Sequence, residues 1–251
     1  MAKKLNYNFI RQLIARNLER LALILENSKT CSDVGPLRSA ASKCKNDPSK
    51  SDKWEYEINR LILAVDKPKH VIPRSILDVK LTLDLSLMGT CTAYNDICHK
   101  NDTHDAFKEL TMDLMIQGTD TKNTYRCTWH LDRHITTATS NASPDAHPHY
   151  HFQYGGKRMR EVVNTGDTLL LDPPRIAHPP LDAILAIDFA LSNYKPSARR
   201  VLINDSEYVA LLRDAQKIFW RPYASIAASK WGTKIDTELK PEMIWPQLCA
   251  G

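Results

Sequence analysis

The sequence lacks a long apolar run. No stretch approaches the roughly 18 to 20 residues that cross a bilayer, and the longest candidate, residues 184–191, is interrupted by Asp188. The amino-terminal residues include lysines but lack the apolar core of a secretory signal peptide. These absences predict a cytoplasmic protein that has no membrane partner.

Paired cysteine motifs are also missing. The six cysteines show no Cys-x-x-Cys spacing, so neither a zinc ribbon nor a disulfide framework is supported, and free thiols are expected. Hydrophobic residues make up 43% and charged residues 25% of the chain, which is ordinary for a globular protein and argues against general disorder. A chain of 251 residues can bury a core in one large domain, with or without a helical appendage.

The positive charge is unevenly distributed. Residues 1–60 hold twelve Lys and Arg against seven Asp and Glu, whereas the remaining chain is balanced at twenty-two of each. A basic excess of this kind is typical of a nucleic-acid-binding surface or of a solvated helix face. Both interpretations stay open, and neither places the excess beside the histidines discussed below.

Helical periodicity marks both ends of the chain. Apolar residues recur at helical spacing over residues 6–27, 36–45 and 54–65, again after Pro179-Pro180, and from Ser206 onward. We expect Pro222 to kink or divide the last helix. Residues 28–53, apart from the short helix, and residues 89–105 are expected to be polar loops.

Between these helices the apolar residues alternate with polar ones, as in half-buried strands. Strands are predicted at residues 77–87, 110–117, 125–132 and 149–154, with a short fifth run at 168–171. Strands between two sets of helices indicate an α+β fold, in which an antiparallel meander of four to five strands carries the C-terminal helices on one face. The predicted organisation is a basic helical region at 1–70, the α+β domain at 71–231 and an irregular tail at 232–251.

Histidines are concentrated in one predicted hairpin. Six of the nine lie within residues 130–178, at positions 130, 134, 147, 149, 151 and 178. Strand periodicity places His147, His149 and His151 on one face. Tyr150, Phe152 and Tyr154 fall on the other face, which we expect to pack on the core. The histidine face is therefore expected to meet solvent or a cleft.

The neighbouring strand is predicted to face these histidines with polar groups. Its alternation presents Arg126, Thr128, His130 and Asp132 on one side, and paired strands lie about 5 Å apart. The two polar faces would then meet in one site.

Three kinds of chemistry fit this pattern. The first is metal-free phosphodiester cleavage, in which imidazoles act as acid and base near neutral pH; its catalytic candidates are His130, His147, His149 and His151. Phosphate or substrate contacts would come from Arg126, Asp132, Lys157, Arg158, Arg175 and His178. The second is a divalent metal held by His147, His149, His151 and His130. The third is a histidine-bearing surface with no chemistry.

Two family resemblances accompany these residues. The segments Tyr125-Arg-Cys-Thr-Trp-His130 and His147-Pro-His-Tyr-His151, followed by a helix opened by Pro-Pro, resemble TumE-type proteins of prokaryotic toxin–antitoxin systems over residues 125–192. That resemblance implies an RNA-directed toxin or a relative in an antiviral defence system, with an antitoxin or defence-complex subunit as partner. It extends to His130, His149 and His151.

The second resemblance concerns the order of elements. A helix, a four-strand meander, an extended loop with His147-Pro148 and then helices is similar to ubiquitin-conjugating domains. The segment Thr168-Leu-Leu-Leu-Asp172 stands where those domains hold their catalytic cysteine, and no cysteine is present there. This resemblance implies a non-catalytic interaction module, as the alternative to a nuclease of the histidine cluster.

Overall fold

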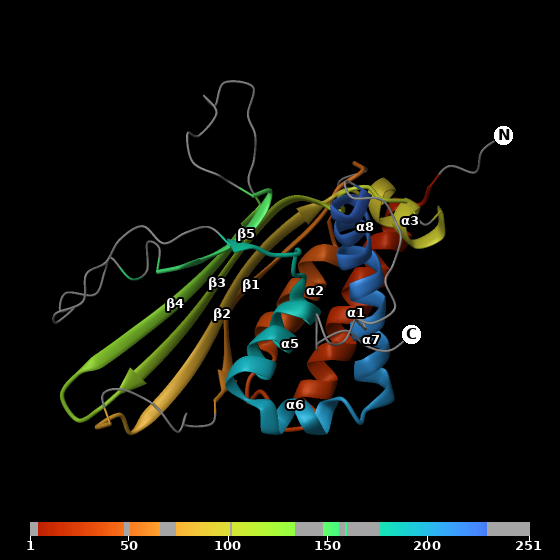
Figure 1. The fold of residues 1–251 in the computed structure, drawn as a ribbon. Coiled ribbons are helices and arrows are strands. Elements are labelled where there is room, and N and C mark those ends of the chain that lie inside the picture. The colour runs from red at the N-terminus through yellow and green to blue at the C-terminus, as the bar shows by residue number, and fades with distance from the viewer. Residues whose placement is uncertain are drawn as a thin grey trace.

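The protein is described from a computed structural model, which covers residues 5–47, 51–65, 74–100, 102–133, 148–155, 159 and 176–229. It consists of one antiparallel sheet with helices packed against one side (Figure 1). The predicted α+β class, with C-terminal helices on one sheet face, is confirmed. No helix in the described part of the chain is long and apolar enough to cross a membrane.

The sheet has six strands in chain order, each antiparallel to the one before it. The strands are β1 (Trp54–Ala64), β2 (Asp78–Gly89), β3 (Phe107–Thr119), β4 (Thr124–Arg133), β5 (Tyr150–Tyr154) and β6 (Ile176–Ala177). The four longer strand predictions correspond to β2 to β5, whereas the short run at 168–171 lies outside the described residues. The sheet therefore holds more strands than the four to five expected.

Strand β1 corrects the prediction of a helix at 54–65. Its inward residues alternate up to Ile58, and the register against β2 then shifts before Leu61. At this bulge Arg60 has a φ of 56° and donates its backbone N–H to the Asp84 carboxylate at 2.7 Å. The bulge inserts residues between buried positions, so Trp54, Ile58 and Leu61 acquire the spacing of a helix face.

A helix also replaces part of the loop expected at 89–105. Helix α3 (Cys91–Lys100) buries Cys91, Tyr94 and Ile97, which are three residues apart. Three apolar residues at this spacing cover one side of a short helix. The surrounding polar residues conceal this pattern in the sequence.

The amino-terminal helices agree with expectation. Helix α1 (Tyr7–Asn27) is capped by Asn6, whose side chain accepts the Phe9 N–H, and helix α2 (Gly35–Lys45) follows it. Both contribute to the same buried core as the strands. The predicted domain boundary at residue 70 falls between β1 and β2, which are paired along their length.

The carboxy-terminal helices begin later than Pro179-Pro180. They are α5 (Ala183–Tyr194), α6 (Pro196–Leu202), α7 (Ser206–Ala215), a π-helical turn η1 (Gln216–Trp220) and α8 (Arg221–Ser229). The predicted interruption near Pro222 is present as the π turn. Because Pro222 has no N–H, a regular helix would leave the Ile218 carbonyl unpaired there. The Arg221 N–H instead reaches the Gln216 carbonyl.

The two sides of the sheet differ in character. The helix-facing side buries residues such as Leu81, Leu83 and Leu85. The outer side carries Lys80, Thr82 and Asp84 of β2. The residues paired with them in β3, and those paired in turn in β4, lie on the same side of the sheet. In Figure 1 the turn joining β3 to β4 extends beyond the helices, whereas the opposite end of β3 lies near α3 and α8.

Candidate functional site

The predicted pairing of the two histidine-bearing strands is present. In β4 and β5, Asp132 stands opposite His151 and His130 opposite Gln153. Tyr150 and Phe152 are buried, as expected. Tyr154 is 38% exposed, which corrects its assignment to the core, and His151 is only 3% exposed, which corrects the expectation of an accessible histidine face.

His130 is held between two aspartates on the outer side of the sheet. Its Nδ1 lies 2.7 Å from Asp113 Oδ1, and its Nε2 bonds Asp132 Oδ2. Burial lowers the pKa of His130, but the two hydrogen bonds and the two charges outweigh it and raise the pKa to about 10. At neutral pH this side chain is an imidazolium that donates from both nitrogens and has no lone pair with which to accept a proton.

The surroundings of His130 are negative overall. Asp84 stands opposite Asp113 in the register, so a third carboxylate lies one strand beyond the pair formed by His130 and Asp113. Asp132 Oδ1 is buried and has no hydrogen-bond partner among the described residues. Arg126 lies four residues from His130 along β4, opposite Gln117, a separation of roughly 13 Å. This cluster favours cations over phosphate.

His149 belongs to a different cluster, centred on Asp105. Its Nε2 lies 2.9 Å from Asp105 Oδ2, and the Arg133 Nε donates to the same oxygen at 3.0 Å. The Tyr150 hydroxyl and the Phe107 N–H donate to Asp105 Oδ1. Burial raises the pKa of Asp105, but the hydrogen bonds from His149, Tyr150 and Arg133 together lower it to about 2. Asp105 is therefore a fixed negative charge.

The Asp105 cluster forms the edge of a pocket with a volume of about 320 Å³. The remaining lining is apolar or aromatic and comes from the start of β3 and the residue before it, the start of β5, the segment before α5, η1 and α8: Ala106, Phe107, Tyr150, Pro180, Ile218, Phe219, Pro222, Tyr223, Ile226 and Ala227. His104 joins Asp105 and His149 at the polar edge. The start of β3 and helix α8, which contribute lining residues, lie at the end of the sheet near α3 (Figure 1). The size and lining of the pocket are those of a ligand site.

His178 is a packing residue. Its ring lies edge-on to Phe152 at 4.6 Å and to Phe189 at 5.8 Å. Its Nδ1 lies 2.6 Å from the Pro179 carbonyl oxygen, to which it donates. Burial lowers the pKa of His178 to about 4, so this imidazole is neutral at physiological pH.

The predicted site residues therefore fall into separate places. His130, Asp132 and His151 are neighbours on β4 and β5, and Arg126 lies four residues from His130 along β4. His149 lies at the pocket, and His178 packs against Phe152 and Phe189. His147, Lys157, Arg158 and Arg175 lie outside the described residues.

A metal-ligand arrangement occurs elsewhere. Among the described residues, the group with converging ligand atoms is Asp96, Asp102 and His104, whose atoms lie within 4.8 Å of one another. It contains none of the histidines predicted as ligands. Lys100 already pairs with Asp96 at 3.0 Å, which supplies a cation at this position.

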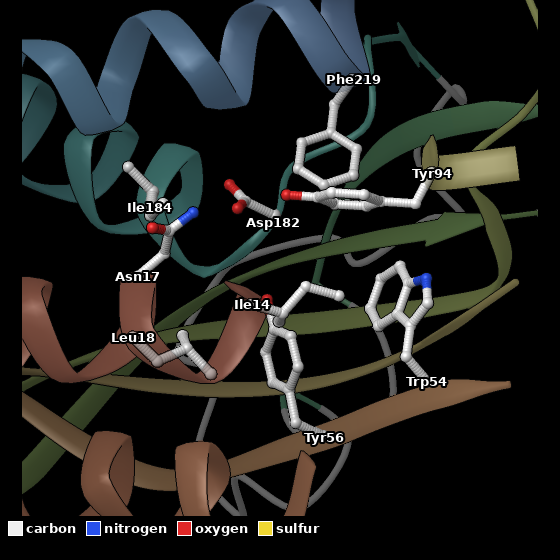
Figure 2. A pocket seen from close by; sticks show the side chains of 9 residues that line it. All are labelled: Ile14, Asn17, Leu18, Trp54, Tyr56, Tyr94, Asp182, Ile184 and Phe219. Carbon is white, nitrogen blue, oxygen red and sulfur yellow. The ribbon is translucent and has the colours of Figure 1, made fainter. Parts of the chain in front are cut away.

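A second, much smaller cavity of about 20 Å³ surrounds Asp182 (Figure 2). The Asp182 carboxylate caps α5 by accepting the Leu185 N–H at 2.9 Å, and Figure 2 shows the Tyr94 hydroxyl pointing toward it. Burial raises the pKa of Asp182 to about 7, against backbone hydrogen bonds that lower it. The cavity is too small for an organic ligand. The buried Asp182 carboxyl is therefore expected to affect the stability of the fold.

The sequence contained little sign of the pocket. Asp105 falls in a segment expected to be a loop, and its partner His149 is 44 residues away. Phe219 and Ile226 fall within the segment from Ser206 onward, for which the sequence predicts only a helix that Pro222 kinks or divides. A usable signal was the short interval between Asp105 and the following strand, because carboxylates beside a strand end often accept backbone N–H groups.

Comparison with known proteins gives no relative from which a role could be transferred. No family model, no curated protein and no solved structure matches the chain.

Proposed function

We propose that this protein is a binding module whose ligand site is the pocket beside Asp105 and His149. The observation that carries the proposal is the coexistence of an apolar cavity of about 320 Å³ with one polar edge. Ligand sites are typically concave and mainly apolar, with a few fixed polar groups that orient the ligand. The resemblance to ubiquitin-conjugating domains likewise implies a non-catalytic interaction module.

The polar edge is preorganised. Asp105 receives donors from Arg133 of β4, from His149 and Tyr150 at the start of β5, and from the first residue of β3, so its carboxylate is held without a ligand. Preorganised groups lose little conformational entropy on binding. Ile226 of α8, which lines the pocket, is 55% exposed. Its burial against a ligand would contribute favourably to the free energy of binding.

The test is titration of the full chain with the neutral dye N-phenyl-1-naphthylamine, followed by fluorescence. Saturable binding to one site is expected. Ala227 lines the pocket and Ala228 does not, and both are exposed on α8. Ala227→Trp should fill the pocket and abolish binding, whereas Ala228→Trp should bind like the wild type. Absence of saturable binding, or equal loss in both variants, would overturn the proposal.

A second candidate is the RNA-directed nuclease of a toxin or defence system. The observation that favours it is the His149–Asp105 pair, because a carboxylate that orients an imidazole is typical of general bases. The carboxylates around His130 and the apolar pocket beside His149 argue against a nuclease, because neither surrounding attracts phosphate. Cleavage of single-stranded RNA by the wild type and its loss in His149→Ala, with unchanged thermal unfolding, would support the nuclease; no cleavage by the wild type would eliminate it.

A further inference from the structure

The hydrogen bond between His149 and Asp105 determines what His149 offers to the pocket. An ionised carboxylate only accepts hydrogen bonds, so the Nε2 atom of His149, 2.9 Å from Asp105 Oδ2, carries the proton. A neutral imidazole then has its lone pair on Nδ1. His149 therefore presents a hydrogen-bond acceptor, with 49% of its side chain exposed.

Asp105 itself is not available as a ligand acceptor of comparable strength. His149, Arg133, Tyr150 and the Phe107 N–H already donate to its two oxygens. Arg133 also balances its charge at 3.0 Å. A cationic ligand would thus find the carboxylate already paired with Arg133, and an anionic carboxylate ligand would bring no hydrogen-bond donor to the His149 acceptor.

His104 repeats the arrangement on the same edge. Its Nε2 lies 3.3 Å from Asp102 Oδ2, and the residue lines the pocket. The edge of the pocket therefore holds two imidazoles that each lie beside an aspartate. His149 is the one whose tautomer is set by its hydrogen bond to the carboxylate.

The pocket floor suits a flat ring. Phe107 and Phe219 stack with centroids 4.7 Å apart and an interplanar angle of 14°, and Tyr150 meets Tyr223 edge-on at 6.2 Å. Aromatic side chains favour further rings in offset or edge-on contact. A volume of about 320 Å³ accommodates one fused bicyclic ring system.

From these observations we propose that the pocket binds a neutral aromatic molecule bearing an O–H or N–H donor, of the phenol or indole class, with the donor bonded to His149 Nδ1. This inference rests on the proposed binding function and specifies its ligand. It predicts discrimination by hydrogen-bond donation rather than by charge.

The test compares three probes of the same bicyclic shape by titration calorimetry: 2-naphthol, naphthalene and 2-naphthoate. The wild type is expected to bind 2-naphthol about 3- to 10-fold more tightly than naphthalene, the ratio that one net hydrogen bond provides, and 2-naphthoate most weakly. His149→Phe should bind 2-naphthol and naphthalene equally. His149→Gln, which retains both a donor toward Asp105 and an acceptor, should keep part of the preference.

The outcomes separate this inference from the function beneath it. Equal binding of 2-naphthol and naphthalene by the wild type, or tightest binding of 2-naphthoate, overturns the donor inference while leaving a binding pocket. No binding of any probe overturns both. Indole and N-acetyltryptophanamide distinguish a free ring from one presented by a peptide: binding of either with the same loss in His149→Phe supports the donor chemistry, and failure of both overturns it.

Discussion

The Nδ1 atom of His130 lies 2.7 Å from Asp113 Oδ1 across the β3–β4 pair. Because the opposite nitrogen bonds Asp132, the ring acts as a charged crosslink between two carboxylates. Because His130 crosslinks two carboxylates as a cation, the stability of the fold should depend on its protonation and therefore on pH.

Alkaline pH should weaken the fold through His130. The pKa of His130 is about 10 in the folded protein and about 6.5 in an unfolded chain. The folded state therefore retains a proton that the unfolded state releases, and stability falls as pH rises from about 6.5 through about 10. We expect a loss of about 2 kcal/mol across this window, discounted for partial exposure, measured by urea unfolding at pH 6 and pH 10.

The matched variants are His130→Ala and His130→Gln. His130→Ala leaves Asp113 and Asp132 without their shared cation and should cost about 3 kcal/mol at pH 6. His130→Gln should cost less, because its amide still donates. A wild type whose stability is unchanged from pH 6 to pH 10 would contradict the assignment.

Asp182 should act across a different pH window. Its pKa is about 7 in the folded protein and about 3.9 in an unfolded chain, so the folded state binds the extra proton between these values. The Asp182 contribution to stability is therefore complete below about pH 4 and declines as pH rises through about 7.

The substitution Asp182→Asn keeps a cap for α5 but removes the buried charge. We expect it to raise the free energy of unfolding by about 2 kcal/mol at pH 8 and to be near neutral at pH 4.5. Denaturant unfolding at both pH values measures this difference. Asp205→Asn, at the exposed N-cap of α7, is the control and should show no comparable gain.

Gly89 should be intolerant of any side chain. A Cβ atom there would lie 2.2 Å from the Ala106 carbonyl oxygen and 2.5 Å from the Trp54 ring. Gly89→Ala must therefore displace the backbone next to Asp105, and we expect a loss of about 3 kcal/mol together with weakened binding in the pocket. Gly35→Ala meets only the exposed Asp33 side chain and should be mild; equal melting temperatures for the two variants would contradict this account.

Much of the sheet could be predicted because β2, β3 and β4 alternate without interruption over many residues. Strand β1 could not, since the bulge at Arg60 changes its period to one that resembles a helix. A bulge depends on the partner strand, here through Asp84, and a local window does not contain that partner.

The candidate site was less accessible to sequence reasoning. Alternation correctly separated the faces of Tyr150 and His151, but it carries no information about what covers each face, and His151 proved buried. The meeting of His149 with Asp105 depends on the bend before β5 and on the approach to β3. Histidine spacing therefore located the region, whereas the chemistry of each ring depends on carboxylates supplied by other strands.

The π turn at Gln216–Trp220 determines which side chains of α8 face the pocket. A π turn adds one residue to the helix, which rotates everything after it by about 100° relative to an uninterrupted α-helix. Ile226 and Ala227 line the pocket only in this rotated phase. Deleting Gln216 or Lys217, the residues at the start of η1 that do not line the pocket, would rotate α8 by the same angle in the opposite sense. A different set of α8 side chains would then face the pocket, without any substitution among the lining residues.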